Sequence, residues 1–505
     1  MLTDNRHVFF AWTSKDKGQR GKGVEGQREV YTAGEGLGLT ADLPAPHSFT
    51  ELFRLCPSAP LLLRPSAPLP LCPLVIYHLS FIISSLNVKL MPRVLLLLPT
   101  TTYRAADFLA AAERMNVDVV AASEKPNVMA SKHPEVLLTL DFRDPEAAAR
   151  TVREFHKAYP IDAVIPVDDD TAVVAATIGS ALSLKHNSIE SAQAARNKHT
   201  FVELLHRHGL AAPWYRLFTT AEDPKQAARA VSYPCVLKPL FLSASRGVIR
   251  ADDPLAFAAA WRRILKILED PEVAARGGEA AKQLLVEEFI PGQEVALEGM
   301  LDKGELRVLA IFDKPDPLEG PFFEETIYVT PSRHPESHRR QIAGCVASAA
   351  AAIGLREGPI HAELRFNENG IWIIEMAARS IGGLCSRTLR FGTGLSLEEL
   401  ILRHALNLGI GHIQREQRAA GVMMIPIPGA GILQEIQGLE AARAVPRIEG
   451  VTVSVPLGKG LVPLPEGSSY LGFIFSRAET PAAAETALRA AHRQLHFVIQ
   501  PEGCN

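Results

Sequence analysis

The sequence lacks the cysteine pattern of a disulfide-bonded or zinc-bound protein. It has six cysteines in 505 residues, scattered without a CxxC pair. This usage is typical of a reducing compartment, so we expect a cytoplasmic protein with no disulfide or zinc framework. An excess of charge of one sign is also lacking. The net charge of −3 gives no electrostatic reason to expect nucleic acid or a membrane as a partner.

The N-terminal region lacks a hydrophobic run long enough to span a bilayer. Residues 74–86 are apolar, but this stretch is shorter than the ~20 residues that a spanning helix needs. It follows a Pro-rich segment in which Pro-Ser-Ala-Pro-Leu occurs at 57–61 and again at 65–69. We predict that residues 1–90 are a low-complexity, unstructured extension and that the folded protein starts at Met91. A membrane-associated leader is the alternative.

The rest of the chain is too long for one ordinary core and predicts several domains. Residues 91–185 alternate strand and helix patterns, such as a buried strand at 94–98 and a helix at 145–158, which predicts an α/β domain with a small parallel sheet. Residues 186–409 mix hairpins and helices and predict an α+β unit in two lobes. Residues 410–505 combine strands with a last helix and predict an α+β cap.

Two strand-like segments, residues 362–366 and 371–376, are joined by an Asn- and Gly-rich connection and predict a hairpin. If the loop is the three-residue segment 368–370, with its Gly in a left-handed conformation, Glu363 lies directly opposite Glu375. A two-residue turn would instead place the two glutamates on opposite faces of the hairpin.

The three-residue loop is favoured because it separates apolar from charged residues. It places these apolar residues on one face: Ala362, Leu364, Phe366, Trp372, Ile374 and Met376. Glu363 and Glu375 then lie side by side on the other face, where like charges are destabilising. A hard divalent cation bound by their oxygens would remove that cost. The alternative is that they are two unrelated surface glutamates.

A second motif has the composition of a phosphate-binding loop. A short strand ends at Lys238 and continues into Phe-Leu-Ser-Ala-Ser-Arg-Gly at 241–247. Small residues such as Ser243, Ser245 and Gly247 let backbone N–H groups approach phosphate closely, and Lys238 adds a point charge. The GxxxxGK[ST] order of a Walker loop is absent. Taken alone, the segment is explained more simply as an ordinary hairpin turn.

A third motif is a strand, a Pro-Gly turn and a second strand at residues 284–295. The backbone from Glu287 through Glu288 to Ile290 is placed to hydrogen-bond the flat edge of a base. Glu294, seven residues after Glu287, is placed to accept two ribose hydroxyls. A solvated acidic edge is the alternative.

An Asp-rich turn, Asp168-Asp169-Asp170, follows the short strand at 163–166. Such strand-to-helix turns lie at the carboxyl edge of a parallel sheet, where ligands collect. We favour the simpler interpretation that Asp170 or Thr171 caps the following helix.

These motifs, in this order, resemble the ATP-grasp superfamily of ligases, whose two α+β lobes hold ATP between them. The resemblance covers about residues 91–500. It implies that Lys238 and a second lysine, Lys198, bind phosphate. It implies that Arg379 steadies an acyl phosphate and the transferred phosphoryl group. The other implied contacts are ATP contacts at Ser243, Ser245, Gly247, Glu287, Glu288, Ile290 and Glu294, and magnesium or manganese ligands at Glu363 and Glu375.

The resemblance also implies a reaction. ATP-grasp ligases transfer the γ-phosphoryl group of ATP to a carboxylate, and an amine then attacks the acyl phosphate, with release of ADP and phosphate. The expected partners are therefore small-molecule carboxylates and amines, and the oligomeric state stays open, a homodimer included. One departure concerns the metal. Ala377 stands where many of these enzymes have an Asn ligand, which leaves the number of metal ions open.

Within the superfamily, the ending Glu-x-Ala-x-Arg-x-x-Gly-Gly at 375–383 is similar to that of the L-amino-acid ligases, which make dipeptides. Biotin-carboxylase-type ligases are similar over the same regions, so an ATP-dependent carboxylase is one alternative and a non-catalytic ATP-binding protein another. Glu324 and Glu325 are placed to pair a substrate ammonium, or equally to belong to a solvated loop. We expect structural roles for His361 and for Cys385, which has no base visibly paired with it.

Overall fold

The computed structural model describes residues 91–501 except 128–129, 131 and 412–413. The prediction made for residues 1–90 therefore lies outside the described residues. Among the helices of the described ranges, none is long and apolar enough to cross a membrane.

The N-terminal part is an α/β unit with a parallel sheet in the order β3-β2-β1-β4. The strands are β1 (Arg93–Leu97), β2 (Asp118–Ser123), β3 (Leu137–Thr139) and β4 (Ala163–Pro166), and the helices are α2 (Ala105–Arg114), α3 (Pro145–Ala158) and α4 (Asp169–Ala181). Val94 and Leu96 pack with α2, while Leu95 and Leu97 pack with α3 and α4. Both faces of β1 are therefore covered, which explains its uninterrupted apolar sequence. The predicted parallel sheet is confirmed.

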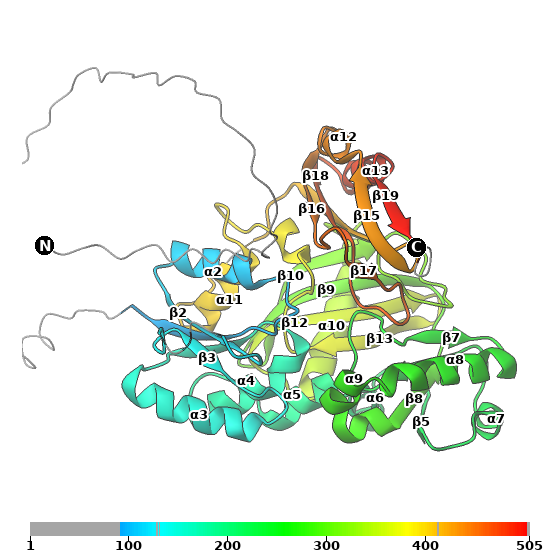
Figure 1. The fold of residues 1–505 in the computed structure, drawn as a ribbon, viewed down its shortest axis with the longest axis horizontal. Coiled ribbons are helices and arrows are strands. Elements are labelled where there is room, and N and C mark those ends of the chain that lie inside the picture. Colours follow the sequence, from blue (N-terminus) through cyan, green and yellow to red (C-terminus); the bar gives the residue numbers. More distant parts are fainter. Residues whose placement is uncertain (1–90, 128–129, 131, 412–413, 502–505) are drawn as a thin grey trace, which may run out of the picture. The chain divides into compact units, whose positions relative to one another are not determined.

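A small lobe follows, built on an antiparallel sheet in the order β5-β8-β6-β7. Its strands are β5 (Tyr215–Thr219), β6 (Cys235–Pro239), β7 (Ile249–Ala251) and β8 (Gln283–Glu288). Its helices and the two that precede it are α5 (Ile189–Arg196), α6 (Lys198–Arg207), α7 (Pro224–Ala227), α8 (Pro254–Leu268) and α9 (Pro271–Gly277). Trp261 and Phe257 of α8 are fully buried against the sheet. Figure 1 shows this lobe as the green region around α8.

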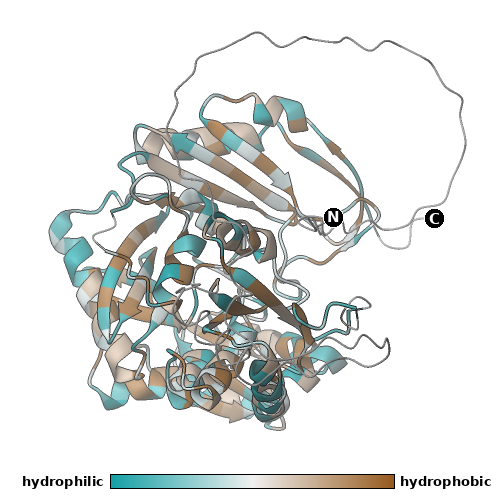
Figure 2. Ribbon diagram, turned by 90° about the vertical axis from the view of Figure 1, so that its left-hand side faces the viewer, coloured by the Kyte–Doolittle hydropathy of each residue, from teal (hydrophilic) through white to brown (hydrophobic). Residues whose placement is uncertain are grey.

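The large lobe is built on an eight-stranded sheet in the order β13-β12-β9-β10-β11-β14-β18-β16. Its strands are β9 (Gln293–Asp302), β10 (Glu305–Lys314), β11 (Ile327–Thr330), β12 (Gly358–Asn367), β13 (Gly370–Ala377), β14 (Ala419–Ile425), β16 (Ile448–Val453) and β18 (Gly472–Ala478). Helix α10 (Glu336–Ala352) packs on it through Ile342, Val346 and Ala349. Figure 2, which is coloured by hydropathy, shows hydrophobic residues along many of the strands.

The C-terminal residues both extend this sheet and add a smaller one. Strands β14, β16 and β18 belong to the large sheet, so the predicted boundary between 409 and 410 divides segments that share one sheet. The smaller sheet has the order β17-β15-β19. The remaining elements are α11 (Leu397–Ala405), α12 (Leu439–Arg443), α13 (Pro481–His492), β15 (Gly431–Gln437), β17 (Gly460–Leu461) and β19 (His496–Gln500). The division into domains stays a prediction.

The β12–β13 hairpin confirms that the two glutamates pair, but its loop is not the predicted three-residue loop. Asn367 pairs with Gly370, so the loop is the two-residue segment 368–369 rather than three residues. That loop alone would have placed the glutamates on opposite faces. A bulge at Ile374 shifts the register by one residue, and Glu363 therefore pairs with Glu375.

The two-residue turn also changes which residues of β13 face the core. Ile371 and Ile373 pack in the core cluster together with Met376, whereas Trp372 lies opposite Arg365. The predicted core face, which contained Trp372 and Ile374, is therefore wrong for these two positions. The physical reason is that every residue between the turn and the bulge is one step out of the predicted alternation.

Candidate functional site

The charged face of the hairpin is one wall of a buried polar site, and a lysine missed by the sequence analysis is at its centre. Lys314, the last residue of β10, is 3% exposed at its side chain. Its Nζ lies 2.7 Å from Glu294 Oε1 and 3.4 Å from Glu363 Oε1, and it also contacts Glu325 Oε1. Burial alone would lower the pKa of Lys314, but the carboxylates, led by Glu294, raise it well above its ordinary value.

Sheet register brings Lys314 to this position. Lys314 pairs with Glu294 across β10 and β9, and Glu294 pairs with Arg365 across β9 and β12. Arg365 Nε donates to Glu294 Oε2 at 2.8 Å. Glu294, predicted as a ribose acceptor, is thus already held from both sides by cations and is nearly buried. A basic residue after an apolar strand was the only local signal for Lys314.

Glu325 shares the polar space between Lys314 and Glu363. Burial, together with the charge of Glu363, raises the pKa of Glu325 to about 7. Tyr328 Oη donates to Glu325 Oε1 at 2.7 Å. Glu325 therefore lies inside the site and is not part of a solvated loop. The pKa of Glu363 moves the other way, because Lys314 and His361 outweigh the effect of burial and hold it well below its ordinary value.

His361 packs between two carboxylates beside the metal-ligand candidate. Its Nδ1 is 3.1 Å from Glu298 Oε2, and its Nε2 is 3.4 Å from Glu363 Oε1. Burial lowers the pKa of His361, but hydrogen bonds to Glu298 and Glu363 outweigh it and raise it to about 9. Glu298 also accepts from the Ile381 N–H at 3.0 Å, so it links the hairpin to the chain after Arg379. A structural role for His361 fits these contacts.

The two lysines expected at the phosphates approach from other elements and are each paired with one glutamate. Lys198, at the start of α6, is 3.0 Å from Glu375 Oε1, and its Nζ also donates to the Leu242 carbonyl at 2.8 Å. Lys238, on β6, contacts the carboxylate of Glu287. Both lysines are nearly buried, so each requires its partner. Lys198, Lys238 and the hairpin are thus brought to one site.

The predicted adenine-binding segment is placed beside this site with part of its backbone already bonded. The side chain of Glu287 is buried against Lys238 rather than exposed, and burial raises its pKa. Glu288 N–H donates to the Trp214 carbonyl at 3.0 Å. The Ile290 carbonyl accepts from Arg365 Nη1 at 2.8 Å, while the Ile290 N–H has no hydrogen-bond partner among the described residues. That N–H is the group left for a base edge.

The loop at 241–247 adopts a conformation suited to an anion. Ala244 and Ser245 both have φ of 54°, a left-handed conformation that non-glycine residues seldom adopt. Within the described chain, the N–H groups of residues 243–245 have no hydrogen-bond partner. Gly247 also has a positive φ, and a Cβ there would lie 2.8 Å from the Pro239 ring. Consecutive unpaired N–H groups form a nest for phosphate oxygens.

Arg379 is fixed by the Asp-rich turn, which the sequence analysis assigned to helix capping. Its Nη2 donates to Asp169 Oδ2 at 2.7 Å, and its Nη1 donates to the Ser380 carbonyl at 2.9 Å. The Asp169 carboxylate raises the pKa of Arg379 against the effect of burial. The residue that caps α4 is Asp168 rather than the predicted Asp170 or Thr171, which lie in the first turn of the helix, and Thr171 Oγ1 accepts from the Asp168 N–H at 3.4 Å. The turn therefore both begins α4 and contributes to the site.

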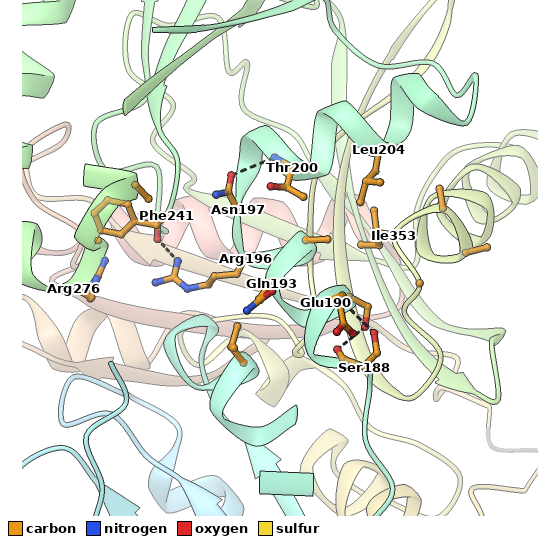
Figure 3. Close-up of a pocket in the computed structure, with 18 residues that line it drawn as sticks. Ser188, Glu190, Gln193, Arg196, Asn197, Thr200, Leu204, Phe241, Arg276 and Ile353 are labelled. Atoms are coloured by element: carbon orange, nitrogen blue, oxygen red, sulfur yellow. Dashed lines mark hydrogen bonds between the residues drawn. The ribbon is translucent and has the colours of Figure 1, made fainter. Parts of the chain in front are cut away.

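The third aspartate of this turn contacts the small lobe. Asp170 contacts Arg196 and lies 3.2 Å from Arg276 Nη1 of α9. Arg196 also donates to the Phe241 carbonyl at the start of the phosphate-binding loop. Figure 3 shows Arg196, Phe241 and Arg276 at one end of a cavity of about 780 Å³, with Glu190 and Ser188 at the other end. The loop is thereby connected to the N-terminal unit.

Cys385, which lies close to Glu325, is buried, and burial raises the pKa of its thiol. A nucleophilic cysteine requires the opposite shift. This geometry agrees with the expected structural role.

The carboxylates of the site fit a hard divalent cation. Glu363 and Glu375 project oxygen ligands from directly opposed backbone positions. Their side chains contact different cations, Lys314 and Lys198. Glu363 also belongs to a cluster with Glu294 and Glu325 in which the ligand oxygens lie within 4.8 Å of one another. A cation between the two hairpin glutamates would replace the ammonium of Lys198 as the partner of Glu375.

Comparison with known protein families gives three matches along the chain. An ATP-grasp N-terminal domain matches residues 109–185, an ATP-grasp domain matches residues 231–388, and an L-amino acid ligase C-terminal domain 2 matches residues 423–500. These matches fall on the parallel-sheet unit, on the two lobes with the hairpin, and on the C-terminal strands.

Individual relatives agree with these matches. An uncharacterised protein of Sinorhizobium fredii, y4rH, is 23% identical over 81% of this chain and 84% of its own length. The alanine–anticapsin ligase of Bacillus subtilis is 24% identical over 59% of this chain and 66% of its own length. Among solved structures, the L-amino acid ligase of Bacillus licheniformis is 27% identical, with a TM-score of 0.69 over 81% of this chain and 99% of that one. The chain belongs to the ATP-grasp superfamily of ligases, and within it resembles the L-amino acid ligases.

Proposed function

We propose that this protein is an ATP- and magnesium-dependent ligase that joins a carboxylate to an amine through an acyl phosphate and releases ADP and phosphate. Amino acids are the proposed substrates. The observation that carries the proposal is the convergence of Lys198 of α6, Lys238 of β6, Glu375 of β13 and Arg379 of the segment directly after β13 on one site.

ATP is proposed to bind between the two lobes. The unpaired N–H groups at 243–245, with Lys198 and Lys238, would hold its phosphates, and the Ile290 N–H would bind the base. Magnesium held by Glu363 and Glu375 would supply charge neutralisation at the phosphates. Manganese satisfies the same oxygen-ligand chemistry.

The residues of the chain would act by position and charge rather than as nucleophiles. Arg379 presents a planar fork of donors, oriented by Asp169, toward the oxygens on which negative charge develops during phosphoryl transfer. Lys238 holds the phosphoryl group in line with the acceptor carboxylate. The buried setting of these groups excludes water, which protects the acyl phosphate from hydrolysis.

The amine side of the reaction is proposed to involve Glu325. This carboxylate is buried next to Glu363 and Lys314, and its pKa of about 7 means that it exchanges a proton near neutral pH. An amino-acid ammonium must lose a proton before it can attack. Glu324 is half-buried nearby, and burial raises its pKa as well.

The test is a screen for ADP release across pairs of amino acids, with products identified by mass spectrometry. We expect ADP, phosphate and a product whose mass equals the two amino acids minus water, with no dependence on added bicarbonate. A requirement for bicarbonate would instead indicate an ATP-dependent carboxylase. Absence of ADP release with every pair, while ATP still binds, would indicate a non-catalytic ATP-binding protein and contradict the proposal.

A further inference from the structure

The phosphate-binding loop is held in place at its C-terminal end by the C-terminal part of the chain. Gly247 N–H donates to the Pro465 carbonyl at 2.9 Å. Arg246 Nε donates to the Glu466 carbonyl at 2.7 Å. Both acceptors lie in the segment at 462–467, between β17 and β18 and more than two hundred residues away in sequence. The loop is therefore not held by the small lobe alone.

The segment that accepts these bonds is itself a tight turn. Gly467 N–H donates to the Pro463 carbonyl at 2.8 Å. A Cβ at Gly467 would lie 1.8 Å from the Val462 carbonyl oxygen, so only glycine fits there. The two acceptor carbonyls are thus presented by backbone with little freedom to move.

The side chain of Glu466 ties this turn to the small lobe. Arg263, on α8, donates from Nη2 to Glu466 Oε2 at 2.9 Å and also contacts Oε1 through Nε, which makes the pair bidentate. The guanidinium of Arg263 also lies over the Phe322 ring, 4.7 Å from its centroid. One ring face and two hydrogen bonds fix the orientation of Arg263, and through it that of the turn.

These contacts leave the phosphate-binding part of the loop available. The N–H groups of 243–245 have no hydrogen-bond partner in the described part of the chain, whereas the Gly247 N–H donates to the Pro465 carbonyl. Ala244 and Ser245 are held in a left-handed conformation that costs on the order of 1 kcal/mol at each residue. A contact that fixes the end of the loop reduces its tendency to relax out of this conformation.

We propose that Glu466 is a positioning residue for ATP: it holds the turn at 462–467 against α8, and the turn holds the phosphate-binding loop in its anion-binding conformation. This inference rests on the proposed function, because it assigns the phosphates of ATP to that loop. It gives the C-terminal domain a part in nucleotide binding without a contact to the nucleotide.

The primary test compares Glu466→Ala with the wild-type protein. The Arg263–Glu466 pair is 42% and 35% exposed at its side chains, so its effect is modest. We expect the KM for ATP and the dissociation constant for a non-hydrolysable ATP analogue to rise about threefold. We expect kcat at saturating ATP, and the KM values of the other substrates, to stay within about twofold of the wild-type values, because Glu466 does not lie at the reacting groups.

Backbone hydrogen exchange provides a second readout that does not depend on turnover. In nucleotide-free protein, the peptide covering residues 240–250 should exchange faster in Glu466→Ala, since Gly247 N–H loses a fixed acceptor. A purely structural role of Glu466 would change global unfolding without this local effect. Glu440→Ala is the matched control, because the ion pair that Glu440 forms within the described residues is a local one with Arg443, in the same C-terminal region.

If Glu466→Ala is unstable, exchanging the charges of Arg263 and Glu466 provides a second test of the pair. Arg263→Glu and Glu466→Arg should each weaken ATP binding, and the double variant should recover most of the wild-type affinity. Wild-type affinity and exchange in Glu466→Ala would overturn this inference and leave the proposed function intact. A wild-type protein that does not bind ATP at all would overturn both.

Discussion

The site contains two buried groups of charges that are organised differently. Around Lys314, one ammonium contacts three carboxylates, all of them on the large sheet or the segment next to it. Around the expected phosphates, Lys198 and Lys238 each pair with a single carboxylate, and each pair joins different elements. The first, the crowded group, has three carboxylates around one shared ammonium. The second, the paired group, consists of two separate lysine–glutamate pairs.

The difference indicates which group can change partners. Removing one carboxylate from Lys314 leaves two others, so that group keeps its structure when a ligand binds. Among the described residues, Glu375 is the one carboxylate paired with Lys198, so a cation that bound Glu375 would free Lys198 for a phosphate oxygen. If ATP and a metal ion bind together, as proposed, the Lys198–Glu375 pair would exchange partners without leaving either charge unpaired. On this view the charges around Lys314 keep their partners when a ligand binds, whereas the Lys198–Glu375 pair changes partners.

The largest expected effect tests this contrast through stability. Lys314→Met leaves three buried carboxylates without their common cation and should lower the free energy of unfolding by about 3–5 kcal/mol. Lys198→Met removes a single pair whose carboxylate is 34% exposed, so a loss of only about 1 kcal/mol is expected. Urea denaturation followed by circular dichroism measures both. Equal losses would show that the two groups do not differ in the way proposed.

The next effect concerns turnover. Glu375→Gln keeps the shape of the side chain but removes the charge that would bind metal, and kcat should fall at least about a hundredfold. The protein should remain folded, since Glu375 is one of the more exposed members of the site. Steady-state ADP release and a thermal melt check the two parts. A variant that retains activity would show that Glu375 is not a metal ligand.

A third effect is the pH dependence of stability conferred by His361 in the crowded group. Its pKa is raised from 6.5 to about 9 in the folded state. The stabilisation is therefore complete below about pH 6.5 and is lost as pH rises toward 9, with a size on the order of 3 kcal/mol. His361→Gln should lack this loss between pH 6.5 and 9. Parallel unfolding curves for both proteins across that range would contradict the assignment.

The smallest of these effects comes from the support of Arg379. Asp169→Asn keeps a hydrogen-bond acceptor but removes the charge that orients the guanidinium, so kcat should fall about tenfold with little change in the KM for ATP. Asp141→Asn is the control, because Asp141 forms a similar pair with Arg143 on the surface. If both variants behave alike, Asp169 has no role beyond the beginning of α4.

Local sequence patterns predicted the elements whose residues carry their own signals. Helix α3 spans the predicted residues, because Asp144 caps it and Pro145 occupies its first turn. The apolar run of β1 and the short strand β4 were also predicted. The pairing of Glu363 with Glu375 was correct, but the loop length was wrong, since no residue type marks Ile374 as a bulge.

The parts of the site that could not be predicted depend on contacts distant in sequence. Lys314 reaches Glu363 only because β10, β9 and β12 adopt one particular register, and Asp169 reaches Arg379 from a different unit of the chain. Hydrophobic periodicity fixes which face of a strand is buried, but it does not determine which strands become neighbours. The roles of Glu294 and Glu287 were therefore predicted without the cations that hold them.

The β12–β13 hairpin contains two register shifts that compensate each other, one at the turn and one at the bulge. The two-residue turn moves β13 out of phase with β12, and the extra residue at Ile374 restores the phase before Glu375 is reached. Each shift depends on the other. Changing the turn by one residue, or removing the bulge, would by itself turn one glutamate away from the other. We therefore expect a one-residue insertion or deletion in the turn to preserve the site only if it is matched by a second one at the bulge.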